Sequence, residues 1–241
     1  MGYVYLALIT DTISSIDAVI ESSWSGKYFL TVDIDWAIDE VISDTLDLIA
    51  TSGKAATWFV THPTSIIDSI RKTPRQEIAI HPNFNGLLDG SAEESTADTV
   101  LARLLNFVPE ARAVRSHSMT QSSRLLQKFK TVGLSHDCNT LIPLSAKMRV
   151  RPWKDWNHLT RVPHVWEDDI WLHGGEPVVP LRPIDDCLTV VDFHPIHVAL
   201  NSPSIDHYES TRTVHRHWPT LRSRRHVGPG VRTWFEEVLQ G

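Results

Sequence analysis

The sequence predicts an α/β fold in which parallel strands alternate with helices. Apolar runs of strand length alternate with amphipathic stretches of helical spacing, and polar residues recur just after the strand-like runs. Such alternation implies parallel strands joined by right-handed crossovers. The 241 residues and 41% hydrophobic content suffice for one domain with a substantial core, and a single α/β barrel can use the whole chain.

The alternation is regular over the first half of the chain. The residue patterns predict strands over 28–34, 55–60, 76–80 and 113–114, and helices over 38–51, 65–71, 96–107 and 122–131. In the first of these helices Ile38, Val41, Ile42, Leu46 and Ile49 recur at helical spacing, and Gly53 follows its end. A late, β-branched strand is expected over 188–193 and a last helix over 231–239.

Two regions break this rhythm. Residues 140–186 are rich in Pro and Trp, which predicts loops and short strands within the same domain. Residues 215–225 are basic and are expected to form an irregular, solvated arm. The alternatives for this arm are contact with an anionic sugar, a diphosphate carrier or a partner subunit.

Composition narrows the class of protein. A net charge of −6 argues against a dedicated nucleic-acid partner. Cys138 and Cys187 are too few for a disulfide framework and are expected to be reduced, as in a cytoplasmic protein. The apolar stretch 3–9 follows no basic residue and is too short to span a membrane, so we expect no secretion signal and a cytoplasmic location. Thirteen histidines suit metal binding and acid–base chemistry, and nine tryptophans offer faces for sugar rings.

The stretch Thr31-Val32-Asp33-Ile34-Asp35 is the most informative part of the sequence. Positions two apart on a strand point to one face, so both carboxylates are expected to project into one small volume. Two such carboxylates repel each other unless a cation or a shared proton lies between them. This pattern favours a metal ion and a general base at the end of the strand.

Three further strand-like runs end in ionisable residues. His81 follows the third strand, Arg115 and His117 follow the fourth, and His194 follows the late strand. Each alone is typical of a capping or solvated residue. Because the carboxyl ends of parallel strands meet at one edge, their recurrence favours a shared pocket.

These motifs resemble those of the polysaccharide deacetylases, the NodB-homology carbohydrate esterases, in the family's order from about residue 28 to 200. The first strand end resembles the Asp-x-Asp variant of the family's opening motif. Ala56-Thr57-Trp58-Phe59-Val60 resembles its structural Ala-Thr-Phe-Phe strand, and Glu77-Ile78-Ala79-Ile80-His81 resembles its Glu-Ile-Gly-x-His strand. The run His81-Pro82-Asn83-Phe84-Asn85 is similar to one in a subgroup linked to bacterial surface polysaccharides.

The resemblance implies a distorted (β/α) barrel and a role for each matched residue. Asp33 would be the general base, Asp35 and His81 metal ligands, Arg115 the residue that orients the base, and His194 a catalytic histidine. The family's second metal histidine is Asn85 here, a weaker ligand, and His117 is the alternative because it would share a strand face with Arg115. Asp192 stands where a leucine is usual. The expected cofactor is a divalent metal, first of all zinc, with cobalt, nickel, iron or manganese as alternatives.

The function implied is a metal-dependent hydrolase that removes N- or O-acetyl groups from a sugar or polysaccharide intermediate. We expect one catalytic domain over 1–241, with its core at about 28–200 and the arm and last helix at 201–241. Two alternatives stay open: another carbon–nitrogen hydrolase that acts on a small amide, and a carbohydrate-binding protein with a decayed site. Four further carboxylates are read as solvated loop charges rather than substrate contacts: Asp137, Glu167, Asp168 and Asp169.

Overall fold

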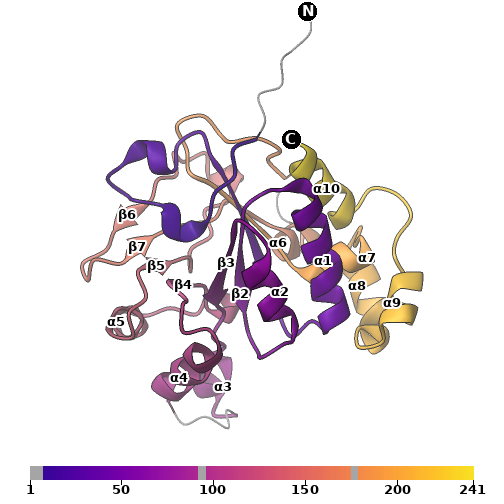
Figure 1. Cartoon of the computed structure of the whole chain (residues 1–241), viewed down its shortest axis with the longest axis horizontal. Coiled ribbons are helices and arrows are strands. Elements are labelled where there is room, and N and C mark those ends of the chain that lie inside the picture. The colour runs from indigo at the N-terminus through magenta and orange to yellow at the C-terminus, as the bar shows by residue number, and fades with distance from the viewer. Residues whose placement is uncertain (1–7, 92–95, 175–178) are drawn as a thin grey trace, which may run out of the picture.

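The computed structural model describes residues 8–91, 96–174 and 179–241. In these residues the chain forms one curled sheet of nine strands with ten helices (Figure 1). The strand order is β6-β7-β5-β4-β3-β2-β1-β9-β8, and every neighbouring pair is parallel except β6 with β7. The sheet curls into a half-barrel, which confirms the predicted α/β fold class.

The strands are β1 Tyr28–Asp33, β2 Ala56–Val60, β3 Gln76–Ile80, β4 Ala113–Val114, β5 His136–Asp137, β6 Trp153–Lys154, β7 Thr160–Arg161, β8 Trp166–Glu167 and β9 Thr189–Phe193. The helices are α1 Asp39–Ser52, α2 Ile66–Lys72, α3 Asn85–Asp89, α4 Ala97–Phe107, α5 Ser123–Thr131, α6 Asp168–Leu172, α7 Pro195–Leu200, α8 Ile205–Thr211, α9 Trp218–Ser223 and α10 Val231–Gln240.

Most predicted elements are present within a residue or two. The helix expected to stop before Gly53 does so, with Gly53 in the left-handed conformation at φ +66°. The basic arm expected to be irregular contains α9, so that expectation was wrong. A proline in the first turn presets the helical backbone there, and the buried Leu221 anchors α9 to the body.

Strand β1 shows how the alternation of side chains builds two layers. All six of its residues are buried. Tyr28, Leu30 and Val32 belong to the large cluster between the sheet and the helices. Phe29 belongs to a separate cluster on the inner face of the half-barrel. Thr31 and Asp33 share that inner face because side chains two apart on a strand point the same way.

The inner face is apolar at the amino ends of β1 and β9 and also farther along β2 and β3, where Phe59 and Ala79 lie level with Asp33. We call this group the inner apolar cluster; its strand members are Phe29, Phe59, Ala79, Ala113 and Val190, with Ile13, Ile16, Trp24 and Cys138 packed among them. The segment that carries η1 (Ile13–Ser15) and η2 (Glu21–Ser23) closes the amino-terminal end of the half-barrel, where the Ile13 N–H donates to the Thr57 hydroxyl and the Ser14 N–H to Glu77. It lies at the top in Figure 1, whereas α3 and α4 lie at the bottom, beyond the carboxyl end of β3.

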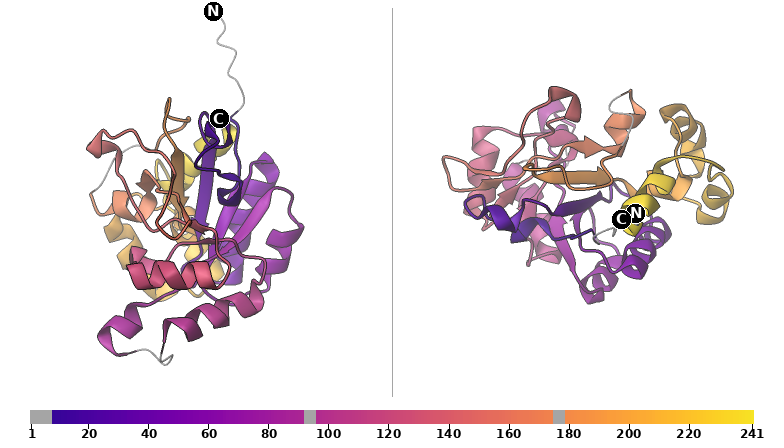
Figure 2. Two further views of the ribbon diagram at one scale, coloured as in Figure 1. Left: turned by 90° about the vertical axis from the view of Figure 1, so that its left-hand side faces the viewer. Right: turned by 90° about the horizontal axis from the view of Figure 1, so that it is seen from above.

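The outer layer holds the two ends of the described chain together. Helix α1 packs against α7 and α10, and α10 (yellow) lies beside α1 in Figure 1 and in the right-hand view of Figure 2. The Leu8 N–H donates to the Gly241 carbonyl at 2.9 Å. Residues 1–7, which hold most of the apolar stretch at 3–9, lie outside the described residues.

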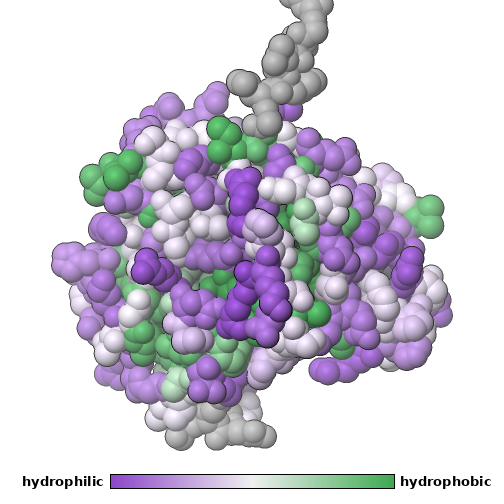
Figure 3. All heavy atoms as spheres, viewed as in Figure 1, coloured by the Kyte–Doolittle hydropathy of each residue, from purple (hydrophilic) through white to green (hydrophobic). Residues whose placement is uncertain are grey.

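The surface carries no broad apolar face in the view of Figure 3, where apolar side chains gather in small, scattered groups. Among the helices that the structure describes, none has the length and apolarity needed to cross a membrane.

Candidate active site

The carboxyl ends of β1, β3, β4 and β9 surround one pocket. The register places Thr31 opposite Asp192 and Ile80 opposite Val114, so the residues that follow these strands lie at one level. The pocket has a volume of about 280 Å³, and its walls include six residues singled out in the sequence: Asp33, Asp35, His81, Arg115, His117 and His194.

Asp35 reaches the pocket from a turn rather than from the strand. β1 ends at Asp33, and Asp35 and Trp36 both have left-handed backbones, with φ values of +36° and +56°. Non-glycine residues in this conformation cost about 1–3 kcal/mol each, so the surrounding structure must hold them there. The Trp36 N–H donates to the Thr61 hydroxyl at 3.2 Å, which helps to fix the turn. The expected proximity of the two carboxylates thus arises from this turn and not from strand alternation.

Three donor atoms, one of them from Asp35, converge in the pocket. Asp35 Oδ1 lies 3.2 Å from His81 Nε2 and 3.2 Å from His117 Nδ1, and these two nitrogens lie 3.4 Å apart. Donor atoms around a tetrahedral zinc ion, with bonds of about 2.0–2.1 Å, lie about 3.3 Å from one another. Asp35 Oδ1 is buried without a hydrogen-bond partner among the described residues. The three side chains therefore fit a divalent metal, with one carboxylate and two imidazoles as ligands.

The electrostatics of Asp35 suit the same role. Burial opposes ionisation, but the imidazoles of His117 and His81 hold the pKa of the Asp35 carboxyl well below its usual range. The carboxylate is therefore ionised over the physiological range.

Asn85 points elsewhere. Its side-chain amide donates to the Ser118 hydroxyl, and its oxygen accepts from the Thr120 hydroxyl, both at 3.1 Å. Asn85 is not among the residues that line the pocket, and His117 is the third member of the donor group. The expectation that His117 shares a strand face with Arg115 was wrong, because β4 ends at Val114 and His117 begins the 3-10 helix η3 (His117–Met119).

A buried ion-pair network lies beneath the donor group. Arg115 is 2% exposed, and its Nη1 lies 2.9 Å from Asp33 Oδ1 and also contacts Asp192 Oδ1. Its Nη2 donates to the Thr31 hydroxyl at 3.0 Å, and its guanidinium lies 4.5 Å from the centre of the Phe59 ring. One guanidinium thus serves two carboxylates, and four contacts fix its position.

Asp33 is held between this network and the donor group. Its Oδ2 lies 3.3 Å from His81 Nδ1, opposite the oxygen that contacts Arg115. Burial raises the pKa of Asp33 to about 6, with Asp192 adding to the rise and Arg115 opposing it. A carboxylate with a raised pKa is a better proton acceptor than an ordinary aspartate.

His194 is fixed by Asp168, a carboxylate that was expected to be a solvated loop charge. Asp168, fully buried at the start of α6, accepts from the His194 backbone N–H at 2.8 Å, and its Oδ1 lies 2.7 Å from His194 Nδ1. Burial disfavours the charged imidazole, but the Asp168 carboxylate raises the pKa of His194 well above its usual value. His194 Nε2 lies 3.7 Å from Asp35 Oδ2, on the pocket side.

The reading of four carboxylates as solvated is therefore corrected for three of them. Asp168 holds His194, Glu167 lies 2.9 Å from His164 Nε2, and Asp137 is buried 2.7 Å from Arg161. Asp169 is partly solvated, with 42% of its side chain exposed, and it lines the pocket together with Glu167. The position of Asp168 just after β8, the neighbour of β9, is the signal that could have revealed its role.

The chain matches known proteins in sequence and in fold. The chain matches the WbmS-like polysaccharide deacetylase family over residues 30–212. It is also similar to a crystal structure of a candidate polysaccharide deacetylase involved in O-antigen biosynthesis, WbmS of Bordetella bronchiseptica, with 40% identity and a TM-score of 0.88 over 95% of this chain and 96% of that one. No curated protein matches the chain. With a family match over most of its length and a solved relative at this identity, the chain belongs to the polysaccharide deacetylase family.

Proposed function

We propose that the protein is a metal-dependent hydrolase that removes an N- or O-acetyl group from a sugar or polysaccharide intermediate, with zinc as the metal. The observation that carries the proposal is the convergence of Asp35, His81 and His117 beside Asp33 and His194 in one pocket. One carboxylate and two imidazoles leave room in a tetrahedral site for a further ligand, as catalytic metal sites require.

A divalent ion held by these three residues would polarise the acetyl carbonyl and lower the pKa of a water molecule. Asp33 would accept the proton of that water as its oxygen bonds to the carbonyl carbon. General-base help of this kind is worth about 10²–10⁴-fold in rate. The contacts of Asp33 with Arg115 and His81 hold its carboxylate in place at the pocket.

His194 would complete the reaction by protonating the nitrogen or oxygen of the sugar as its bond to the carbonyl carbon breaks. Asp168 engages Nδ1, so Nε2 is the nitrogen left to face the substrate. The products are acetate and the free amine or hydroxyl. Asp33 then releases its proton and His194 takes one up from solvent, which restores both groups.

The intact arrangement of base, donor group and histidine supports an active enzyme over a decayed binding protein. The relative's link to O-antigen biosynthesis supports a biosynthetic sugar intermediate as substrate. The proposal includes one catalytic domain over 1–241 and a cytoplasmic location, for which the two free cysteines Cys138 and Cys187 are the support.

The experiment compares Asp33→Asn with Asp35→Asn in protein reconstituted with zinc. Acetate release is measured on a panel of acetylated sugars, with the metal content of each sample. Asp33→Asn should keep its metal and fold while acetate release falls by about 100-fold or more. Asp35→Asn should lose metal affinity first, and excess zinc should restore part of its activity.

The control is Asp47→Asn, the same chemical change at an exposed position of α1. It should match the parent in both measurements. Full activity in Asp33→Asn would remove Asp33 as the base. A parent that binds metal and cleaves a small amide but no acetylated sugar would transfer the proposal to the amide-hydrolase alternative.

A further inference from the structure

A second pocket adjoins the candidate active site. It has a volume of about 290 Å³ and shares Asp35 with the first pocket. Its other walls include Trp36 from the turn after β1, and Tyr208, Arg212, His215 and Arg216 from α8 and the segment that follows. We propose that this pocket binds an anionic group of the acetylated sugar, so that the substrate is an acidic sugar. This inference rests on the proposed function.

The side chains that line this pocket carry positive charge. Two guanidinium groups, from Arg212 and Arg216, line this pocket, and Asp35 is its one lining carboxylate among the described residues. If Asp35 holds a metal ion, its charge is neutralised there and the pocket becomes strongly cationic. Such a local concentration of positive charge contrasts with the net charge of −6 of the chain. An oxyanion is therefore the ligand that complements the pocket.

Neither arginine is held by a strong ion pair among the described residues. In the part of the chain that the structure describes, no ion pair involves Arg216, although a neighbouring hollow that it also lines contains Asp39 and Glu40. The Asp39 carboxylate is engaged by the hydroxyls of Thr64 and Ser65. Arg212 pairs with Glu209 at 3.1 Å, but both side chains are about half exposed or more, and such surface pairs contribute little.

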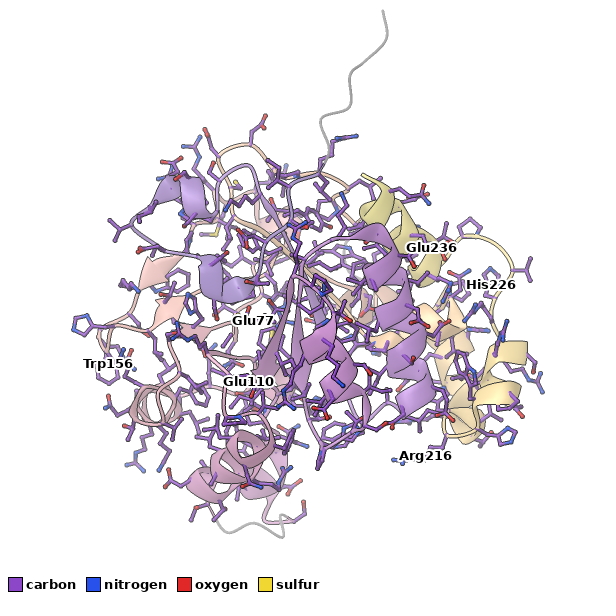
Figure 4. The ribbon with its side chains drawn as sticks, in the orientation of Figure 1. Glu77, Glu110, Trp156, Arg216, His226 and Glu236 are labelled. Carbon is purple, nitrogen blue, oxygen red and sulfur yellow. The ribbon has the colours of Figure 1, made fainter. Side chains whose placement is uncertain are left out.

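The position of Arg216 is visible in Figure 4, where it projects at the lower edge of the molecule. That edge is the one at which α3 and α4 follow the carboxyl end of β3, and the candidate active site opens at the same ends of the strands. An anion bound here would therefore lie on the substrate side of the half-barrel.

Two aromatic side chains also line this pocket. Trp36 is 39% exposed, and its ring lies edge-on to His117 at 5.0 Å between centres. Tyr208 lies on the other wall, with its ring 4.6 Å from His197 and 4.8 Å from His215. Aromatic faces of this kind suit the apolar face of a pyranose ring. A sugar between them could place its acetyl group at Asp33 and its anionic group at the arginines.

The shared chemistry of the ligand is an oxyanion, and it could come from a carboxylate on the sugar or from a phosphate. A guanidinium pairs with either in a bidentate manner. At about 290 Å³ the pocket is at the small end of the range for small-molecule sites, which favours an anionic group attached to the sugar itself over a long polyanionic partner.

The experiment measures kcat and KM of the zinc-loaded protein on three substrates: an N-acetylated hexuronic acid, an N-acetylated hexose phosphate and the matching neutral N-acetylhexosamine. The variants are Arg216→Gln and Arg212→Gln. The matched control is Arg222→Gln, which removes the same charge from an exposed position of α9 outside the pocket. Binding of each sugar is measured separately by titration calorimetry.

We expect the parent to prefer one anionic substrate, and Arg216→Gln to raise its KM about tenfold with a smaller change in kcat. The anionic substrate affected identifies carboxylate or phosphate as the source. Arg222→Gln should retain the preference of the parent. Equal use of anionic and neutral sugars by the parent, or equal effects of Arg216→Gln and Arg222→Gln, would overturn the inference.

Failure of the proposed function gives a different result. If the parent releases no acetate from any sugar, calorimetry still decides the inference: weaker binding of an anionic sugar by Arg216→Gln than by Arg222→Gln supports it. Absence of anionic-sugar binding to the parent contradicts it.

Discussion

On the inner face of β1 and β9, the amino-terminal and carboxyl-terminal halves of the strands differ sharply. At the amino ends, Phe29 and Val190 belong to the inner apolar cluster. Two residues further along the same strands, Thr31 and Asp192 are equally buried and carry polar groups that bind Arg115. A distance of two residues along each strand therefore separates a hydrophobic core from a network of buried charges.

The two halves contribute to the free energy of folding in opposite ways. Burial of apolar surface is favourable at about 25 cal/mol per Å², and it needs no particular partner. Buried charges cost free energy unless each one is paired and hydrogen-bonded. Arg115 meets that requirement for Asp33 and Asp192, and Asp168 meets it for His194. The apolar half is thus expected to support a polar half that is arranged for chemistry.

The largest expected effect comes from the apolar half. Phe29→Ala removes a fully buried ring from the inner apolar cluster and should lower the free energy of unfolding by about 3–5 kcal/mol, measured by urea denaturation. Metal affinity of the molecules that remain folded should change little. Val19→Ala, at a position that is 82% exposed, serves as the control and should cost less than about 0.5 kcal/mol. An equal effect at both positions would break the comparison.

The donor group in the polar half supplies the next effect. His117→Ala should weaken zinc binding by about 100-fold or more, because it removes one of three ligands. Asn85→Ala is the matched comparison, and it should weaken binding less than threefold, by roughly the effect expected for a residue outside the site. Competition with a chromophoric chelator measures both affinities. The opposite order would assign the third ligand position to Asn85.

Asp168→Asn should act on the reaction through His194. The substitution keeps the size of the side chain but removes the charge that holds the imidazole, so kcat should fall by about 10-fold to 100-fold, below the full contribution of a general acid. Zinc content should stay at the parental level. If Asp168→Glu keeps more of the parental kcat than Asp168→Asn does, a role of Asp168 in positioning His194 is supported. Loss of kcat in proportion to loss of folded protein would show a structural role alone.

The smallest effect concerns stability at acid pH. Burial opposes the charge of Glu167, but His164 beside it lowers the pKa of Glu167 from its ordinary value of 4.5 to about 2. Because the folded state depresses this pKa, the carboxylate stabilises the fold fully above about pH 4.5, and that stabilisation is lost as the pH falls through about 2. The difference in Tm between the parent and Glu167→Gln should therefore shrink over this range. A difference that stays constant with pH would contradict the assignment.

Much of the polar half could be predicted because the rule that places it is local. His81, Arg115 and His194 each follow an apolar strand-like run, and parallel strands bring such positions to one edge. The roles assigned to these residues stay predictions until the variants are measured. Their proximity, with Asp33 and Asp35, is a property of the structure.

The rest depended on contacts that a linear pattern does not contain. β8 has only two residues and lies in a stretch rich in Pro and Trp, so no periodicity signalled that Asp168 would be buried against His194. Asp35 reaches the pocket through a left-handed turn that no glycine announces. The helix α9 was missed because it has only six residues and lies within a stretch rich in basic residues, and only the burial of Leu221 reveals its attachment.

The burial of Cys138 gives this protein an internal reporter of its own opening. Its thiol lies fully buried in the inner apolar cluster, and burial raises its pKa well above the usual value, so a thiol reagent can react with it only when the half-barrel opens around the end of β5. Cys187 is partly exposed and offers a reference reaction on the same chain. The ratio of the two labelling rates reads the frequency of local opening directly, without any substitution.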